Sequence, residues 1–107
     1  MDLHKLGAQR SLAYHREIAQ RLLRDEKILV HARERAKQWL LQTPDRPYVR
    51  KWNEVLAGDA SSVASFLAQD TELAEELRQS SPFAGVLNAR ERWQMWRETR
   101  EAFEAKQ

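Results

Sequence analysis

Residues 8–42 read AQRSLAYHREIAQRLLRDEKILVHARERAKQWLLQ, and this stretch decides the fold class. It contains neither Gly nor Pro, and its apolar residues recur at alternating steps of four and three, the period of an amphipathic α-helix. In the first part of the stretch the apolar seam consists of Ala8, Leu12, His15, Ala19 and Leu22. We therefore expect a helix here that buries one side.

The opposite side of this first helix is mostly charged. Arg10, Glu17, Arg21 and Arg24 lie two residues out of phase with the seam, which places them about 200° around the helix axis. The pattern predicts that these four side chains face solvent or a partner.

Asp25 is a predicted N-cap that divides the stretch into two helices. The first would begin near Leu3 or Ala8 and end at about Arg24, and the second would end by Gln42. One continuous helix is the alternative, because no Gly or Pro interrupts the stretch. The predicted buried stripe of the second helix is Ile28, Ala32, Ala36, Trp39 and Leu40.

Turn-forming residues punctuate the middle of the chain. A loop is expected at residues 43–47, because each of its two prolines disfavours helical geometry in the residue before it. A third helix should follow and stop at Gly58. Asp59, and then Asp70 or Thr71, are predicted caps of two short helices.

The last part of the chain combines an apolar loop with one more helix. Residues 80–87, SSPFAGVL, are broken by a proline and a glycine and should be extended, with Phe83 and Val86 held against this chain or another. Asn88 and Glu91 have the spacing of a capping box, which predicts a final helix over residues 89–104.

These elements predict an all-α fold, a compact bundle of about five to six helices with two longer N-terminal helices, short central helices and a longer C-terminal helix. With 107 residues, 42% hydrophobic and 32% charged, the chain is expected to be a single helical domain over 1–107 with a modest core. It has no Cys, so disulfides and thiolate sites are excluded and a cytoplasmic location is expected. Its apolar runs are much shorter than the roughly 20 residues that cross a bilayer, so no membrane association is expected.

Charge is unevenly distributed along the chain. Residues 1–51 carry 12 Lys or Arg and 6 Asp or Glu, a net +6; residues 52–88 carry 1 and 6, a net −5; the remainder carries 5 and 4, a net +1. A basic first half can meet nucleic acid, an acidic partner or the acidic middle of this chain. The best basic surface for nucleic acid is formed by Arg10, Arg21, Arg24, Arg33 and Lys37.

Catalytic and metal-binding patterns are weak. Arg10 and His15 in RSLAYH have the Arg-x4-His spacing of the HEPN ribonucleases, a resemblance that implies an RNase acting across a dimer interface. Five residues separate the two by about 140° on a helix, and His15 lies on the apolar seam, so a hydrogen-bonded core histidine is the favoured interpretation. The three His residues have no metal-ligand spacing and the three Gly form no phosphate loop, so no cofactor, no metal and no enzymatic activity are expected.

A helix-turn-helix outline occurs at residues 52–68, where two short helices meet at Gly58. Its second helix offers Ser61, Ser62 and Ser65 but no Arg or Lys. Because phosphate attraction supplies most DNA affinity, this segment is a poor DNA reader.

Aromatic residues favour protein binding instead. Four Trp are many for this length, and Trp93 and Trp96 cannot both be buried if Met95 is also covered, so one should meet a partner. Trp and Arg are the residues most enriched at binding hot spots. The predicted partner-binding residues are Arg10, Arg21, Arg24, Pro82, Phe83, Gly85, Trp93, Trp96 and Arg97.

RSLAYH near the start, and QSSPFAGVL followed by ERW near the end, resemble small helical bacterial proteins taken to be antitoxin components of toxin–antitoxin pairs. The resemblance implies a cytoplasmic protein that binds and neutralises a cognate toxin-like enzyme. The alternatives are a nucleic-acid-binding transcriptional regulator, the HEPN-like ribonuclease with Arg10 and His15, and a phage-encoded inhibitor protein. The small core and surplus aromatics also leave room for a homodimer.

Overall fold

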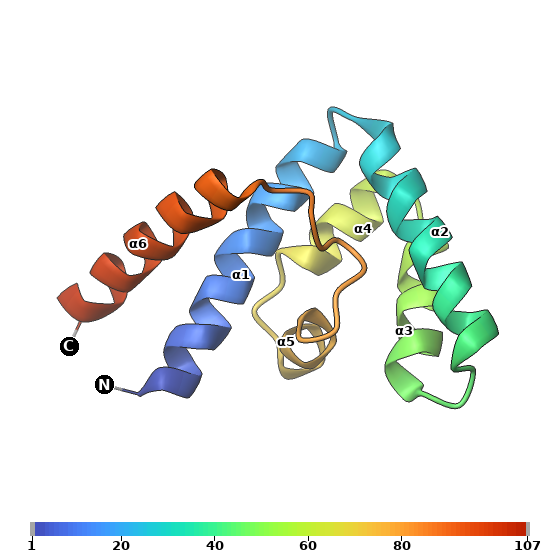
Figure 1. Ribbon diagram of the computed structural model, residues 1–107, viewed down its shortest axis with the longest axis horizontal. Helices are drawn as coiled ribbons and strands as arrows, with labels where there is room; N and C mark the ends of the chain where they lie inside the picture. Colours follow the sequence, from blue (N-terminus) through green and yellow to red (C-terminus); the bar gives the residue numbers. More distant parts are fainter. Residues whose placement is uncertain (1, 107) are drawn as a thin grey trace.

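The computed structural model describes residues 2–106, and they form six α-helices and no strand (Figure 1). The all-α prediction is confirmed, with two long N-terminal helices, short central helices and a long last helix. The helices are α1 (Leu3–Leu22), α2 (Glu26–Gln42), α3 (Pro47–Leu56), α4 (Ala60–Leu67), α5 (Glu72–Arg78) and α6 (Ala89–Ala105).

Side-chain caps fix where the helices begin. Asp25 accepts a hydrogen bond from the Lys27 backbone N–H at 3.1 Å, so the predicted break between α1 and α2 is confirmed, and α1 ends at Leu22. Asp59 caps α4 in the same way. Of the two candidate caps of α5, Thr71 is the one used.

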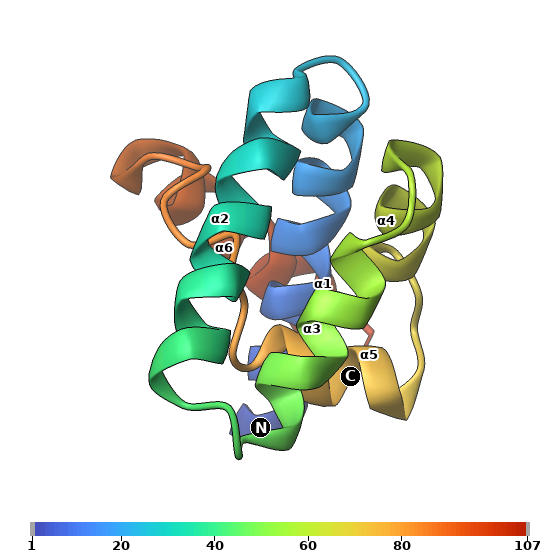
Figure 2. The ribbon, with the colours of Figure 1, turned by 90° about the vertical axis from the view of Figure 1, so that its right-hand side faces the viewer.

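The core lies between α1 and helices α2–α5, whose arrangement Figure 2 shows from the side. Trp52 belongs to the centre of this core. Trp52 is fully buried, its rings lie 5.9 Å from Phe66 and 6.1 Å from Phe83 in edge-on geometry, and its Nε1–H donates to the Leu77 carbonyl at 3.0 Å. The hydrogen bond satisfies the indole donor inside an apolar environment. One side chain thus ties α3, α4, α5 and the loop after α5 together.

The predicted seam of α1 is largely confirmed. Leu12, His15, Ala19 and Leu22 are buried, while Ala8 is half-buried. The stripe of α2 was predicted less well, because Leu29 is buried with Ala32 and Ala36 whereas Leu40 is exposed. In the last turn of α2 it is Trp39, and not its neighbour Leu40, that packs against the core cluster.

Helix α6 lies outside this core. It runs beside α1 on the side away from α2 and α3 (Figure 1), and it packs mainly on α1. All 17 of its residues are described, and none of them is buried. The last helix is therefore a second layer on α1 rather than a member of the central bundle.

Gly7 gives the first testable prediction, since it is exposed within α1 and has no structural need to be glycine. A Cβ built there meets no atom within 4 Å, and its φ is not positive. Glycine inside a helix costs about 1 kcal/mol relative to alanine. We expect Gly7→Ala to raise the free energy of unfolding by about 1 kcal/mol in urea denaturation. A lower stability would mean that α1 is not helical at this position.

Candidate functional site

The predicted partner-binding residues lie in four different places. Arg10 and Trp96 meet where α6 packs on α1, whereas Trp93 and Arg97 lie on the exposed side of α6. A pocket between α1, α2 and the loop at residues 80–88 is lined by Arg21, Arg24, Pro82 and Gly85. Phe83 lies in the core.

Arg10 faces α6 and not open solvent. Its guanidinium carbon stands 3.7 Å from the centre of the Trp96 ring, a close cation–π contact. Its Nε is buried and has no hydrogen-bond partner among residues 2–106. Burial and the nearby charge of Arg100 lower the pKa of Arg10. The face of α1 predicted for solvent or a partner is thus partly covered by the chain's own last helix.

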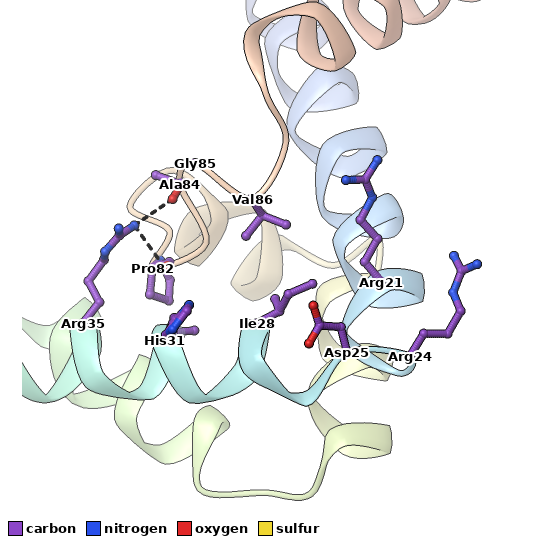
Figure 3. Close-up of a pocket in the computed structure, with 11 residues that line it drawn as sticks. Arg21, Arg24, Asp25, Ile28, His31, Arg35, Pro82, Ala84, Gly85 and Val86 are labelled. Carbon is purple, nitrogen blue, oxygen red and sulfur yellow. Dashed lines mark hydrogen bonds between the residues drawn. The ribbon is translucent and has the colours of Figure 1, made fainter.

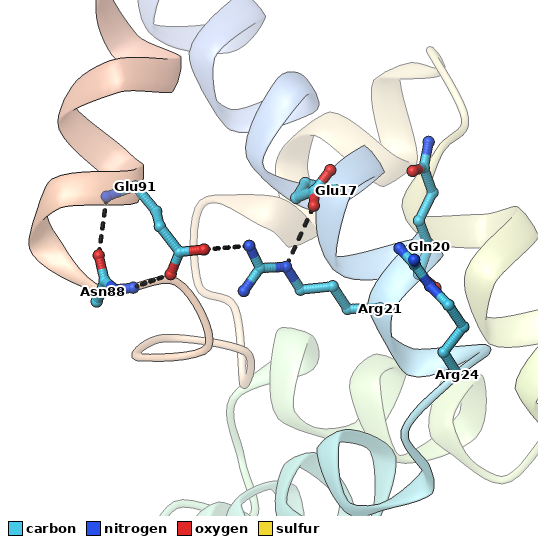
Figure 4. A network of polar contacts seen from close by, with 6 residues as sticks. All are labelled: Glu17, Gln20, Arg21, Arg24, Asn88 and Glu91. Carbon is cyan, nitrogen blue, oxygen red and sulfur yellow. Dashed lines mark hydrogen bonds and ion pairs between the residues drawn. The ribbon is translucent and has the colours of Figure 1, made fainter.

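Arg21 is also occupied within the chain, as Figure 4 shows. It donates to Glu17 at 3.2 Å and to Glu91 at the start of α6. Glu91 in turn accepts from the Asn88 backbone N–H at 3.0 Å, and Asn88 accepts from the Glu91 N–H at 2.8 Å, which completes the predicted capping box. The hydrogen bond from Arg21 holds the pKa of Glu91 below its usual range, and Glu91 raises the pKa of Arg21. Arg21 is therefore paired within the chain while part of its side chain stays exposed, and its predicted contact with a partner stays a prediction.

Arg24 keeps the predicted outward orientation. It is exposed, and its only hydrogen bond within residues 2–106 runs from Nε to the Gln20 carbonyl at 3.3 Å. Together with Asp25 it stands at one end of an open pocket of about 630 Å³ (Figure 3). Ile28 and Val86 face each other across that pocket, and His31 lies farther along α2.

The loop at residues 80–88 is held by the bundle, so part of it is not available for docking. Phe83 is only 1% exposed and packs on Trp52, while its carbonyl accepts from the Tyr14 hydroxyl at 3.1 Å. Pro82 is also buried. The prediction that Phe83 contacts a partner was wrong, because the core of this chain takes the ring.

Gly85 and Ala84 form the exposed tip of that loop. Gly85 has φ +89°, a left-handed conformation that L side chains rarely adopt. Arg35 donates to the Ala84 carbonyl at 2.9 Å and so fixes the tip over α2 (Figure 3). Gly85 therefore lies on an accessible edge of the pocket, and its predicted contact with a partner stays a prediction.

Arginines that hold backbone carbonyls are a feature that the sequence did not reveal. Arg33 donates to the carbonyls of Leu56 and Gly58 at 2.7 and 2.8 Å, at the C-terminal end of α3. Arg16 donates to the Ala68 carbonyl at 3.3 Å, at the C-terminal end of α4. These carbonyls lack partners inside their helices and carry the negative end of the helix dipole. Some arginines of the first half of the chain thus cap the C-terminal ends of helices.

His15 has a structural role in this fold. It is 3% exposed; Nδ1–H donates to the Ser11 carbonyl at 2.7 Å, and Nε2 accepts from the Ser81 hydroxyl at 2.7 Å. Ser81 also accepts the Phe83 N–H at 3.1 Å. Both imidazole nitrogens are therefore used inside the chain, while Arg10 faces Trp96. This arrangement gives no support to the ribonuclease interpretation.

The buried imidazole predicts a pH dependence of stability. Burial, partly opposed by the Ser11 hydrogen bond, lowers the pKa of His15 to about 4 from 6.5. Between these values the unfolded chain binds the proton and the folded chain does not, so stability must fall as the pH drops from 6.5 to 4. Over this pH range the free energy of unfolding of the wild type should fall by about 3 kcal/mol because of His15. The His15→Gln variant lacks the imidazole, so this contribution should be nearly absent from it. Urea unfolding at several pH values measures it, and equal pH slopes in the two proteins would contradict the assignment.

The helix-turn-helix outline corresponds to α3 and α4. Helix α4 buries Val63, Ala64 and Leu67 and packs mainly on α1, while Ser61, Ser62 and Ser65 are exposed. Lys and Arg are absent from α4, so its exposed side offers hydroxyls and no positive charge.

The part of the chain that the structure describes contains no group of three or more His, Asp or Glu placed to hold a metal ion. None of its helices has the length and apolar character required to span a membrane.

The outer face of α6 is the most exposed aromatic surface. We use this name for Arg90, Trp93, Gln94, Arg97, Glu98 and Glu101, which line a shallow depression of about 430 Å³. Trp93 is 56% exposed, and its ring centre lies 5.1 Å from that of Trp96. Trp96 is half-buried and contacts Arg10 on α1. The stack Arg10–Trp96–Trp93 thus leads from α1 to the surface, and Trp93 is the tryptophan of this pair that remains exposed.

Comparison of the chain with protein-family models, with curated proteins and with solved structures finds no match.

Proposed function

We propose that this chain is a protein-binding module that docks through the outer face of α6 onto an enzyme encoded beside it and neutralises that enzyme. The observation that carries the proposal is Trp93, a 56% exposed tryptophan on a fully described helix without a buried residue. A large ring left in water loses the stabilisation that burial would give it. A partner that covers the outer face supplies that burial.

The chemistry around Trp93 suits a protein partner. Arg97 lies one turn after it, with Arg90 one turn before, and both are exposed. Trp and Arg dominate binding hot spots because they combine a large contact area with directed hydrogen bonds. Glu98 and Glu101 border the same depression, so the surface carries both signs of charge. A mixed surface is better suited to a protein than to the uniformly negative backbone of a nucleic acid.

Support for the antitoxin assignment comes from where the two resembling stretches lie. RSLAYH is in α1 and SSPFAGVL is the loop after α5, and they meet through His15–Ser81 at 2.7 Å and Tyr14–Phe83 at 3.1 Å. ERW, residues 91–93, opens α6 and brings Trp93 to the surface. The stretches that carry the resemblance thus lie next to one another in the structure. Together they lead to α6, the helix that we propose contacts the partner.

Co-expression with the product of the adjacent gene tests this function. We expect that product alone to slow growth, and the chain to restore growth and to co-purify with it in stoichiometric amounts. Trp93→Ala should weaken both effects, whereas Leu41→Ala, which also truncates an exposed apolar side chain but on α2, should not. A neighbour that is neither bound nor inhibited would refute the proposal.

A further inference from the structure

A second cavity, of about 550 Å³, lies on a different part of the molecule from the outer face of α6. It is a hollow that is open to solvent and is bordered by α1, the facing ends of α2 and α3, the end of α5, the loop after α5 and the start of α6. Aromatic rings from three helices form one part of its wall, and polar groups form the other. The lining residues used below are Tyr14, Trp39, Tyr48, Arg78, Ser81 and Arg92.

Arg78 is the unusual member of this lining. It is only 4% exposed; its Nη1 donates to the Gln69 carbonyl at 2.6 Å, and its Nε is buried without a hydrogen-bond partner among residues 2–106. No carboxylate of the described chain comes within ion-pair distance of it. Asp70 and Glu75 act on Arg78 only at longer range, and Arg16 adds a second positive charge nearby. A guanidinium stays protonated, so the fold buries a cation whose charge is not paired.

The other residues that line the cavity add positive charge to that of Arg78 and contribute no negative charge. Arg92, one turn into α6, lines the same cavity and is exposed. His15 is neutral and offers its Nε2 only to Ser81. The lining contains no Asp or Glu. An anion entering here meets two arginines, and no opposing carboxylate lies in the wall.

The aromatic wall defines the rest of the ligand. Trp39 and Tyr48 meet edge-on with ring centres 6.0 Å apart, where the end of α2 faces the start of α3. Both are half-buried, so part of each ring is available to a flat partner. Tyr14 completes this side and is fixed by its hydrogen bond to the Phe83 carbonyl. Apolar rings next to a few fixed polar groups are the usual composition of small-molecule sites.

We propose that this cavity binds a small anion that carries a flat aromatic ring, with its phosphate or carboxylate on Arg78 and Arg92 and its ring against Trp39 and Tyr48. The buried positive charge of Arg78 is then paired, which is the condition under which burying a charge is tolerated. This site is independent of the outer face of α6, although Arg92 belongs to the same helix.

Binding is tested with two anionic probes and their neutral counterparts. Adenosine 5′-monophosphate and adenosine represent the phosphate source, and 4-hydroxyphenylacetate and its amide represent the carboxylate source. Saturation-transfer NMR and quenching of tryptophan fluorescence report binding to the wild-type chain. We expect saturable binding of at least one anion, and binding at least about tenfold weaker for its neutral counterpart, because charge-assisted hydrogen bonds are the strong ones.

Variants locate the binding. Arg92→Gln removes one of the two cations at an exposed position that should not impair folding, and Arg97→Gln is the matched change on the same helix at the outer face. Arg92→Gln should weaken the anion about tenfold and Arg97→Gln should leave it unchanged. Arg78→Met is informative only if circular dichroism shows that it folds, and Trp39→Leu replaces it otherwise. Absence of saturable binding by both anions, or equal binding of anion and neutral counterpart, would overturn the proposal.

Discussion

Trp52→Ala should lower the free energy of unfolding by about 3–5 kcal/mol, the largest stability effect expected of a single substitution in this chain. The change leaves a cavity at the centre of the core, removes the ring contacts with Phe66 and Phe83, and removes the hydrogen bond from the indole N–H to the Leu77 carbonyl. Small domains have a total stability of about 5–15 kcal/mol, so the variant should unfold at a much lower urea concentration. Urea denaturation followed by circular dichroism measures the loss.

Trp93→Ala is the matched control for this experiment, because it removes the same side chain from an exposed position. We expect it to change stability by less than about 1 kcal/mol. Similar losses in the two variants would show that α6 belongs to the core, contrary to the arrangement described above.

Trp96→Ala should release α6 from α1 without unfolding the bundle. Trp96 carries the cation–π contact with Arg10 at 3.7 Å, and α6 has no buried residue of its own to hold it in place. Elements with few buried contacts open locally, and their backbone amides then exchange with solvent faster. We expect amide hydrogen exchange in residues 92–105 to rise on the order of tenfold or more, with residues 12–22 nearly unchanged.

The same exchange measurement on Trp93→Ala separates the two tryptophans. Trp93 points to solvent, so its removal should change exchange in α6 by no more than about twofold. If Trp93→Ala released α6 and Trp96→Ala did not, the two roles would be reversed. Trp93 would then hold α6 on α1, and Trp96 would be the residue available to a partner.

Local features of the fold could be predicted from the sequence because a few neighbouring residues determine them. Asp25, Asp59 and the Asn88–Glu91 pair cap their helices through side-chain hydrogen bonds that span two or three residues. The buried side of α1 followed from its period alone, and the buried His15 followed from its place in that period. Such signals do not depend on what the rest of the chain does.

Tertiary placement could not be predicted in the same way. The charged side of α1 was correctly separated from the seam, but nothing local indicates that α6 returns to contact Arg10 through Trp96 and Arg21 through Glu91, 86 and 70 residues later in the chain. Phe83 was assigned to a partner because an apolar loop looks the same whether it docks on another chain or on its own core. The structure decides this by placing the ring against Trp52.

The partners of the basic residues could not be predicted from the sequence either. A basic first half and an acidic middle were recognisable from counting, yet the arginines of α1 and α2 meet backbone carbonyls more often than carboxylates. Arg33 on Leu56 and Arg16 on Ala68 illustrate this. A carbonyl at a helix end is present in every sequence, so composition gives no sign of which arginine will bind it.

The most direct test of the proposed partner-binding surface is the affinity of the purified chain for the product of the adjacent gene, measured by isothermal titration calorimetry with wild type, Trp93→Ala and Leu41→Ala. If Trp93 is a hot spot of the outer face of α6, its truncation should cost at least about 2 kcal/mol of binding free energy, close to a thirtyfold loss, while Leu41→Ala stays within about threefold of wild type. Equal affinities for wild type and Trp93→Ala would contradict the account.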